Sequence, residues 1–104
     1  MAVIDKRRGE KFTITCSFSN TGDAPGTWTV NTVLRGQWSW DGTPQTLSLG
    51  SGESKTLTWI GTVPNVAHCL SSQLIIIADS TELKQDWWIH VIGEALLVVS
   101  AAIS

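Results

Sequence analysis

The chain has 104 residues, of which 42% are hydrophobic, enough for one domain with its own core. Only 15% of the residues are charged, against about 25% in typical soluble domains, and the formal net charge is −2. This balance excludes the basic surface of a general nucleic-acid-binding protein. The first ten residues, MAVIDKRRGE, lack the apolar stretch of a signal peptide, and no run reaches the roughly 18 apolar residues of a membrane span. We therefore expect neither nucleic acid nor membrane as a partner.

Strand-forming residues dominate the chain, and turn signals recur about every 8–12 residues. Residues 11–19 alternate apolar with Thr and Ser side chains, which predicts a half-buried strand. Residues 73–78 are almost continuously apolar, which predicts a central strand. Gly36 is expected to mark a bulge or bend between two strands. The other predicted strands cover residues 27–35, 37–41, 46–49, 54–61 and 86–92.

These elements predict an all-β fold, an immunoglobulin-like antiparallel β-sandwich of seven or eight strands. Residues 9–22 (GEKFTITCSFSNTG) and 49–59 (LGSGESKTLTW) also resemble CARDB-like domains, which are related to bacterial cell-adhesion modules. The resemblance covers about residues 9–92. It implies a seven-stranded immunoglobulin-like or fibronectin type III-like sandwich without catalytic residues. The chain departs from that pattern in its extra Trp residues and in its apolar C-terminal extension.

Residues that could carry chemistry are few. Cys16 and Cys69 do not have the spacing of a zinc site, and either a disulfide between them or two reduced thiols fits the sequence. His68 and His90 are the only histidines, and nothing in their spacing favours a Cys–His nucleophile. The Asp residues lie mostly in or near turns, where they usually cap their own backbone rather than bind calcium. We therefore expect no enzyme activity, no cofactor and no metal site.

The six Trp residues are the most informative side chains. Trp28 and Trp59 lie among inward-facing apolar residues and are predicted in the core. Trp38 and Trp40 share a strand face, whereas the adjacent Trp87 and Trp88 must point to opposite faces. Packing in the core, a protein interface and stacking on a sugar ring all remain open for these residues.

The segment after the last clear strand is apolar on both faces, unlike a half-buried edge strand. We predict a sandwich over residues 1–93 and a C-terminal strand or arm over residues 94–104. A final strand in its own sheet is the alternative to an arm that adds to a neighbouring chain. The predicted interface residues are Trp38, Trp40, Trp87, Trp88, Leu96, Leu97, Val98, Val99 and Ile103.

These features favour a non-enzymatic structural or interaction protein. We expect a small subunit of a virion, such as a capsid decoration or capsid-associated protein. It would assemble through sheet edges and the C-terminal arm, as a homo-oligomer or in a capsid lattice. The alternative is an extracellular module for cell-surface adhesion or carbohydrate binding, which the CARDB-like resemblance implies.

Overall fold

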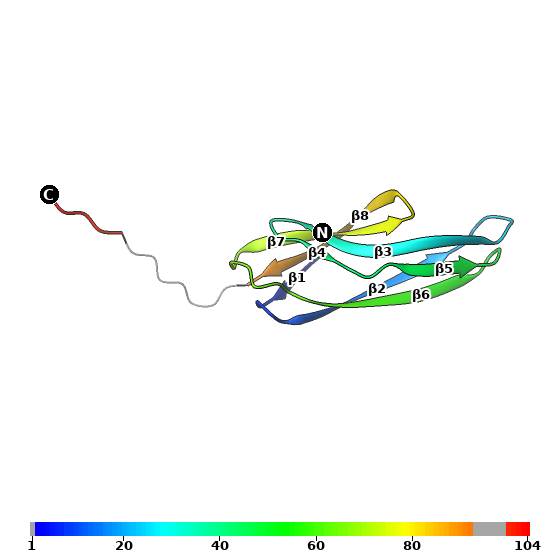
Figure 1. The fold of residues 1–104 in the computed structure, drawn as a ribbon, viewed down its shortest axis with the longest axis horizontal. Coiled ribbons are helices and arrows are strands. Elements are labelled where there is room, and N and C mark those ends of the chain that lie inside the picture. Colours follow the sequence, from blue (N-terminus) through cyan, green and yellow to red (C-terminus); the bar gives the residue numbers. More distant parts are fainter. Residues whose placement is uncertain (1, 93–99) are drawn as a thin grey trace.

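The computed structural model describes residues 2–92 and 100–104, and the chain folds as a sandwich of two β-sheets (Figure 1). The described residues form no helix, and therefore none that could cross a membrane. The strands are β1 (Ala2–Lys6), β2 (Lys11–Ser19), β3 (Gly26–Gly36), β4 (Trp40–Asp41), β5 (Gln45–Leu49), β6 (Ser54–Thr62), β7 (Leu70–Ala78) and β8 (Thr81–Val91).

The two sheets differ in width. The larger sheet has the order β1-β8-β7-β3, with both β4 and β5 paired to β3. The smaller sheet contains β2 and β6 and no other strand of the described residues. All pairs are antiparallel except β1 with β8, which run parallel. The all-β sandwich predicted from the sequence is therefore confirmed, with β7 inside the larger sheet as expected.

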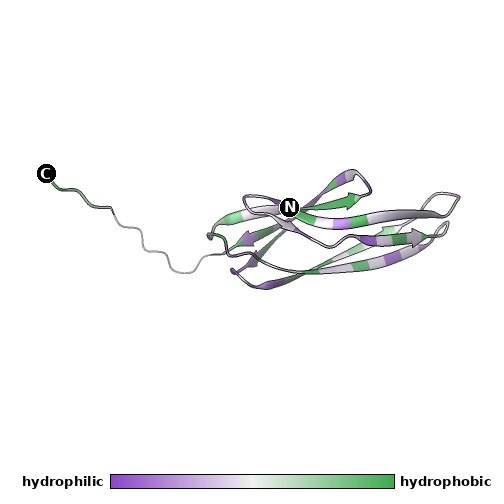
Figure 2. Cartoon of the chain, viewed as in Figure 1, coloured by the Kyte–Doolittle hydropathy of each residue, from purple (hydrophilic) through white to green (hydrophobic). Residues whose placement is uncertain are grey.

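Strand β2 shows how the sequence pattern produces the core. Phe12, Ile14 and Cys16 are buried, while the Thr and Ser residues between them are exposed. Successive side chains of a strand point to opposite faces, so this alternation places one apolar face against the larger sheet. Ile14 lies opposite Trp59 of β6, and both side chains belong to the same buried cluster. Figure 2 shows the resulting mixture of hydrophobic and hydrophilic residues along the strands.

The structure corrects four parts of the predicted strand pattern. Strand β7 begins at Leu70 and β8 at Thr81, earlier than the predicted starts at residues 73 and 86. Residues 2–6, which the sequence did not suggest as a strand, form β1. The strand predicted over residues 37–41 shrinks to Trp40–Asp41, because the chain bends after Gly36. Gly36 has a φ of 148°, and a Cβ there would lie 2.8 Å from the Ser71 carbonyl oxygen, so the expected bend at this glycine is confirmed.

Gly61 of β6 faces the core at a point with no room for a side chain. A Cβ there would lie 2.5 Å from Phe12 Cζ and 2.6 Å from the Trp40 ring. We expect Gly61→Ala to lower the free energy of unfolding by about 1–3 kcal/mol, because both rings must shift. Urea denaturation measures this change. Gly50→Ala is the control, since a Cβ at Gly50 meets nothing within 4 Å; equal losses in the two variants would contradict the steric explanation.

The predicted C-terminal strand or arm lies mostly outside the described residues. Residues 100–104 form no strand and are exposed, and Ile103 is fully open to solvent. Figure 1 places these residues beyond one end of the sandwich, away from both sheets. The predicted interface residues Leu96, Leu97, Val98 and Val99 lie outside the described part of the chain.

Candidate interaction site

An apolar groove of about 660 Å³ runs between β2 and the inner face of the larger sheet. Over residues 2–92 the smaller sheet is two strands wide, so these residues leave part of the larger sheet uncovered beside β2. Its lining includes Ile4 of β1, Ile14 of β2, Leu74 and Ile76 of β7, and Trp87 and Ile89 of β8. We call this feature the β2–β8 groove.

The register of β1 and β8 places apolar side chains along one wall of the β2–β8 groove. Ala2 lies beside Trp87, and Ile4 lies beside Ile89, so the side chains of each pair point to the same face. Ile89 is buried, whereas Ile4 is 42% exposed and Trp87 is 51% exposed. These large apolar side chains face inward but stay exposed, because no described strand of the smaller sheet lies opposite them.

The other wall of the groove is an edge of the smaller sheet, where β2 pairs with no described strand besides β6. The Asn20 amide donates to the Glu53 carbonyl (2.9 Å), and the Val63 amide donates to the Glu10 carbonyl (2.8 Å). Antiparallel pairs alternate between bonded and non-bonded positions, so even-numbered residues of β2 bond to β6. The odd-numbered residues therefore direct their N–H and C=O groups to the open edge. The Gln45 side chain fits this alternation, because it donates to the Thr58 carbonyl on the far side of β6 (3.0 Å).

The Trp residues divide between the core and the surface. Trp59 is buried, and its Nε1 donates to the Thr43 carbonyl (2.8 Å), so its predicted core position is confirmed. Trp28 is half-buried and packs against the core. Trp38 is only 4% exposed, which corrects its prediction as an interface residue. The bend after Gly36 directs Trp38 into the core, where its amide donates to the Ser72 hydroxyl (3.1 Å).

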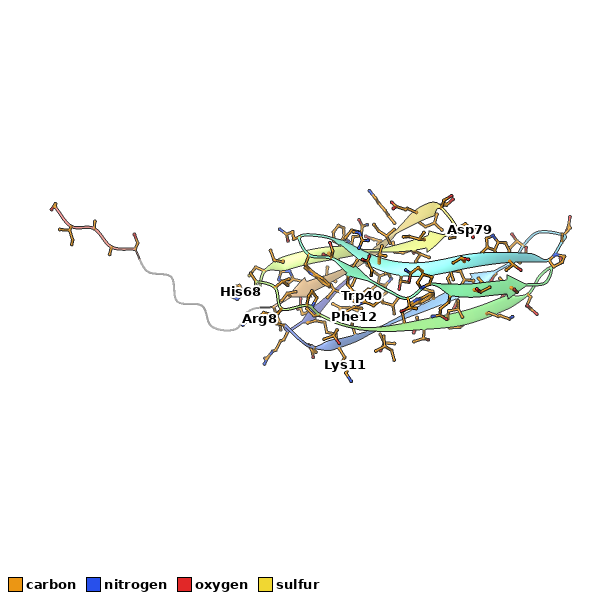
Figure 3. All side chains as sticks on the ribbon, viewed as in Figure 1. Arg8, Lys11, Phe12, Trp40, His68 and Asp79 are labelled. Atoms are coloured by element: carbon orange, nitrogen blue, oxygen red, sulfur yellow. The ribbon has the colours of Figure 1, made fainter. Side chains whose placement is uncertain are left out.

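The other predicted interface Trp residues keep some solvent contact. Trp40 is half-buried, and its ring meets the ring of Phe12 edge to face at 4.9 Å (Figure 3). Trp88 is half-buried on β8, and Trp87 beside it is the most exposed Trp of the described residues. Both residues line the groove, and Trp87 is the one that is more than half exposed.

In the described part of the chain, the titratable side chains do not gather into a metal site. Across residues 2–92 and 100–104, no three His, Cys, Asp or Glu side chains lie together so that they could hold a metal ion. Figure 3 shows His68 and Asp79 at opposite ends of the sandwich. His90 Nδ1 lies 2.7 Å from the Ser71 hydroxyl. Cys16 and Cys69 are both free thiols, the first buried and the second exposed, so the disulfide alternative does not hold in this structure.

Burial raises the pKa of the Cys16 thiol. The unfolded chain therefore loses this proton at a lower pH than the folded chain does. We expect the free energy of unfolding to fall as pH rises from about 8 to about 10, because the stability present below the unfolded pKa is lost. Urea denaturation across this range should show a smaller pH dependence for Cys16→Ala than for the natural chain. Cys69→Ala, at an exposed position, is the control; an unchanged pH slope in Cys16→Ala would contradict this assignment.

Comparison with known proteins identifies a fold rather than a family. No family model matches the sequence, and no curated protein matches it. Similar solved structures include those of the β-glucosidase from Listeria innocua with glucose (TM-score 0.67) and with gluconolactone (0.64), and a third structure of the same enzyme (0.65). Each is 15% identical over 88% of this chain, which spans only 15% of the enzyme's length. This likeness shows the β-sandwich fold alone, and the CARDB-like resemblance stays a prediction.

Proposed function

We propose that this β-sandwich is a non-enzymatic subunit that associates with further copies of itself. The observation that carries the proposal is the uncovered apolar wall of the β2–β8 groove, where Trp87 and Ile4 are 51% and 42% exposed. Large apolar surfaces of this kind on a soluble domain mark sites of contact with other molecules. Trp is also the residue type most enriched where binding energy concentrates in protein interfaces.

Low charge supports the same proposal. Charged residues make up 15% of the chain, and charge is depleted at the centres of protein interfaces. The groove combines apolar side chains from five strands with a sheet edge, so a partner could bury side chains and form backbone hydrogen bonds at once. As its specific form, we propose a subunit of a virion or a comparable assembled particle. Retention of the protein in purified particles, and its loss from them in a Trp87→Ser variant, tests this form.

Self-association of the full chain tests the proposed function. We expect sedimentation equilibrium to show an oligomer, and Trp87→Ser to weaken it by at least about tenfold, because one large apolar contact is lost. Ile60→Ser is the matched control, since Ile60 is 70% exposed on β6 and does not line the groove. A natural chain that stays monomeric at all accessible concentrations would contradict the proposal, as would equal effects of the two substitutions.

Carbohydrate binding is the second candidate, and the exposed Trp87 ring favours it. An accessible Trp ring at the mouth of a groove can stack on a sugar, and the similar β-glucosidase structures name glucose and gluconolactone as ligands of that enzyme. Titration of the protein with these two compounds, followed by Trp fluorescence, tests this candidate. A saturable change that disappears in Trp87→Ala would support it, and an unchanged spectrum would remove it for these two compounds.

A further inference from the structure

We propose that the β2–β8 groove accepts one added β-strand along the open edge of β2, and that residues 95–103 of a second copy supply it. This inference rests on the proposed self-association and names its acceptor and its donor. The acceptor has both parts that strand addition needs. The odd-numbered residues of β2 offer backbone groups at the open edge, and the groove beside them offers an apolar surface.

The length of the donor matches the length of the acceptor. Strand β2 has nine residues, Lys11–Ser19, and residues 95–103 also number nine. A third strand beside β2 would widen the smaller sheet and cover the inner face of β1 and β8. It would bury Ile4 and Trp87, the half-exposed side chains of that wall. One strand of this length would therefore cover the exposed apolar wall of the β2–β8 groove.

The side-chain pattern of the donor identifies which of its faces enters the groove. Alternate residues of an added strand point into the groove, and the others point to solvent. The odd-numbered face of the donor is apolar throughout, whereas the even-numbered face contains Ser100. We therefore assign the odd-numbered residues to the groove: Ala95, Leu97, Val99, Ala101 and Ile103.

A second copy is the occupant, rather than the same chain, because of where the described end of the donor lies. Residues 101–104 are exposed beyond one end of the sandwich. The Ile103 side chain is fully exposed, so it does not lie in the groove of its own chain. Covering a fully exposed apolar side chain with a neighbouring molecule is favourable, because it removes apolar surface from water. The same groove in the second copy is free to accept the corresponding segment in return.

Charge sets the direction of the added strand. Lys6 and Lys11 both line the groove, at the end where β2 begins. Glu94 is the only charged residue of residues 93–104, and it directly precedes the donor. Placing Glu94 near the two lysines orients the donor parallel to β2, with residue 95 close to Lys11.

Two full-chain variants with opposite strand faces test the inference. The double variant Leu97→Asp/Val99→Asp places carboxylates in the groove, whereas Leu96→Asp/Val98→Asp makes the same chemical change on the solvent face. We expect the first to weaken self-association in sedimentation equilibrium by at least about tenfold, and the second by less than about threefold. Both sets of substitutions lie outside residues 2–92, which form the described sandwich, so neither set replaces a side chain of the described core.

A second pair of variants tests the acceptor edge. Thr15→Pro removes an N–H at the open edge of β2, and Thr56→Pro makes the same change at the opposite edge, on β6. We expect only Thr15→Pro to weaken association, by about tenfold, because proline blocks strand addition there. Circular dichroism tests whether both variants are folded. If either is unfolded, chemically synthesised chains with an N-methyl amide at Thr15 or at Thr56 replace the proline variants.

The outcomes separate this inference from the proposed function. A natural chain that associates, with equal loss in the two donor variants or loss in Leu96→Asp/Val98→Asp alone, overturns strand addition and leaves self-association standing. Equal effects of the two proline variants also overturn it. A natural chain that never associates contradicts the proposed function itself.

Discussion

Replacing Trp59 with alanine is expected to lower the free energy of unfolding by about 3–5 kcal/mol. Trp59 is 4% exposed and lies on β6, which with β2 forms the smaller of the two described sheets. Its ring packs in the buried cluster, and its Nε1 donates to the Thr43 carbonyl (2.8 Å). The substitution therefore leaves a large cavity and removes a hydrogen bond that fixes the loop before β5.

Urea denaturation followed by circular dichroism measures this loss. Trp59→Phe is the matched variant, because it keeps an aromatic ring and removes the indole N–H. We expect it to cost about 1–2 kcal/mol, since the hydrogen bond and part of the volume are lost. A loss below about 1 kcal/mol for Trp59→Ala would contradict the central packing role assigned to this residue.

Changing Asn20 to aspartate is expected to lower the free energy of unfolding by about 2–4 kcal/mol, the second largest effect that we predict. Asn20 Nδ2 donates to the Ala24 carbonyl (2.8 Å) and to the Leu49 carbonyl (3.2 Å). Its Oδ1 accepts from the Gly22 amide (3.0 Å). One side chain thus connects the turn after β2 to the end of β5.

Aspartate keeps the acceptor for Gly22 but cannot donate to the two carbonyl oxygens. It also places a carboxylate beside them in a site where Asn20 is only 9% exposed. Thermal denaturation should show a lower midpoint for Asn20→Asp than for Thr21→Ala, a change at an exposed neighbour. Equal midpoints in the two variants would show that the hydrogen bonds of Asn20 do not hold these turns together.

The sequence predicted those strands whose apolar and polar residues alternate over consecutive positions. The alternation of Phe12, Ile14 and Cys16 is such a signal, and the bounds of β2 match it. The turn after β2 is also local, because Asn20 bonds to residues two and four positions further along. Strand β1 was missed because its five residues become a strand only by pairing with β8, about 85 residues away in sequence.

The candidate site depends on contacts between strands that are far apart in the sequence, which no local sequence pattern contains. The sequence correctly placed Trp87 and Trp88 on opposite faces of one strand, but how much of each face is covered depends on the width of the other sheet. The same limit explains Trp38. Its shared face with Trp40 was predicted from alternation, but its burial follows from the bend at Gly36 and from the Ser72 hydroxyl across the sheet. The β2–β8 groove could be found only once the pairing of all strands was known.

The parallel pairing of β1 with β8 has a mechanical consequence. The two strands lie side by side over five residue pairs, from Ala2 beside Trp87 to Lys6 beside Val91, and the Ile92 amide continues the contact by donating to the Lys6 carbonyl. A force that pulls Ala2 and Ile92 apart would slide these strands along each other. All the hydrogen bonds between them would then bear the load together, whereas a hairpin pulled from one end would lose them one at a time. We therefore expect the β1–β8 pairing to resist tension applied between these two ends of the described domain.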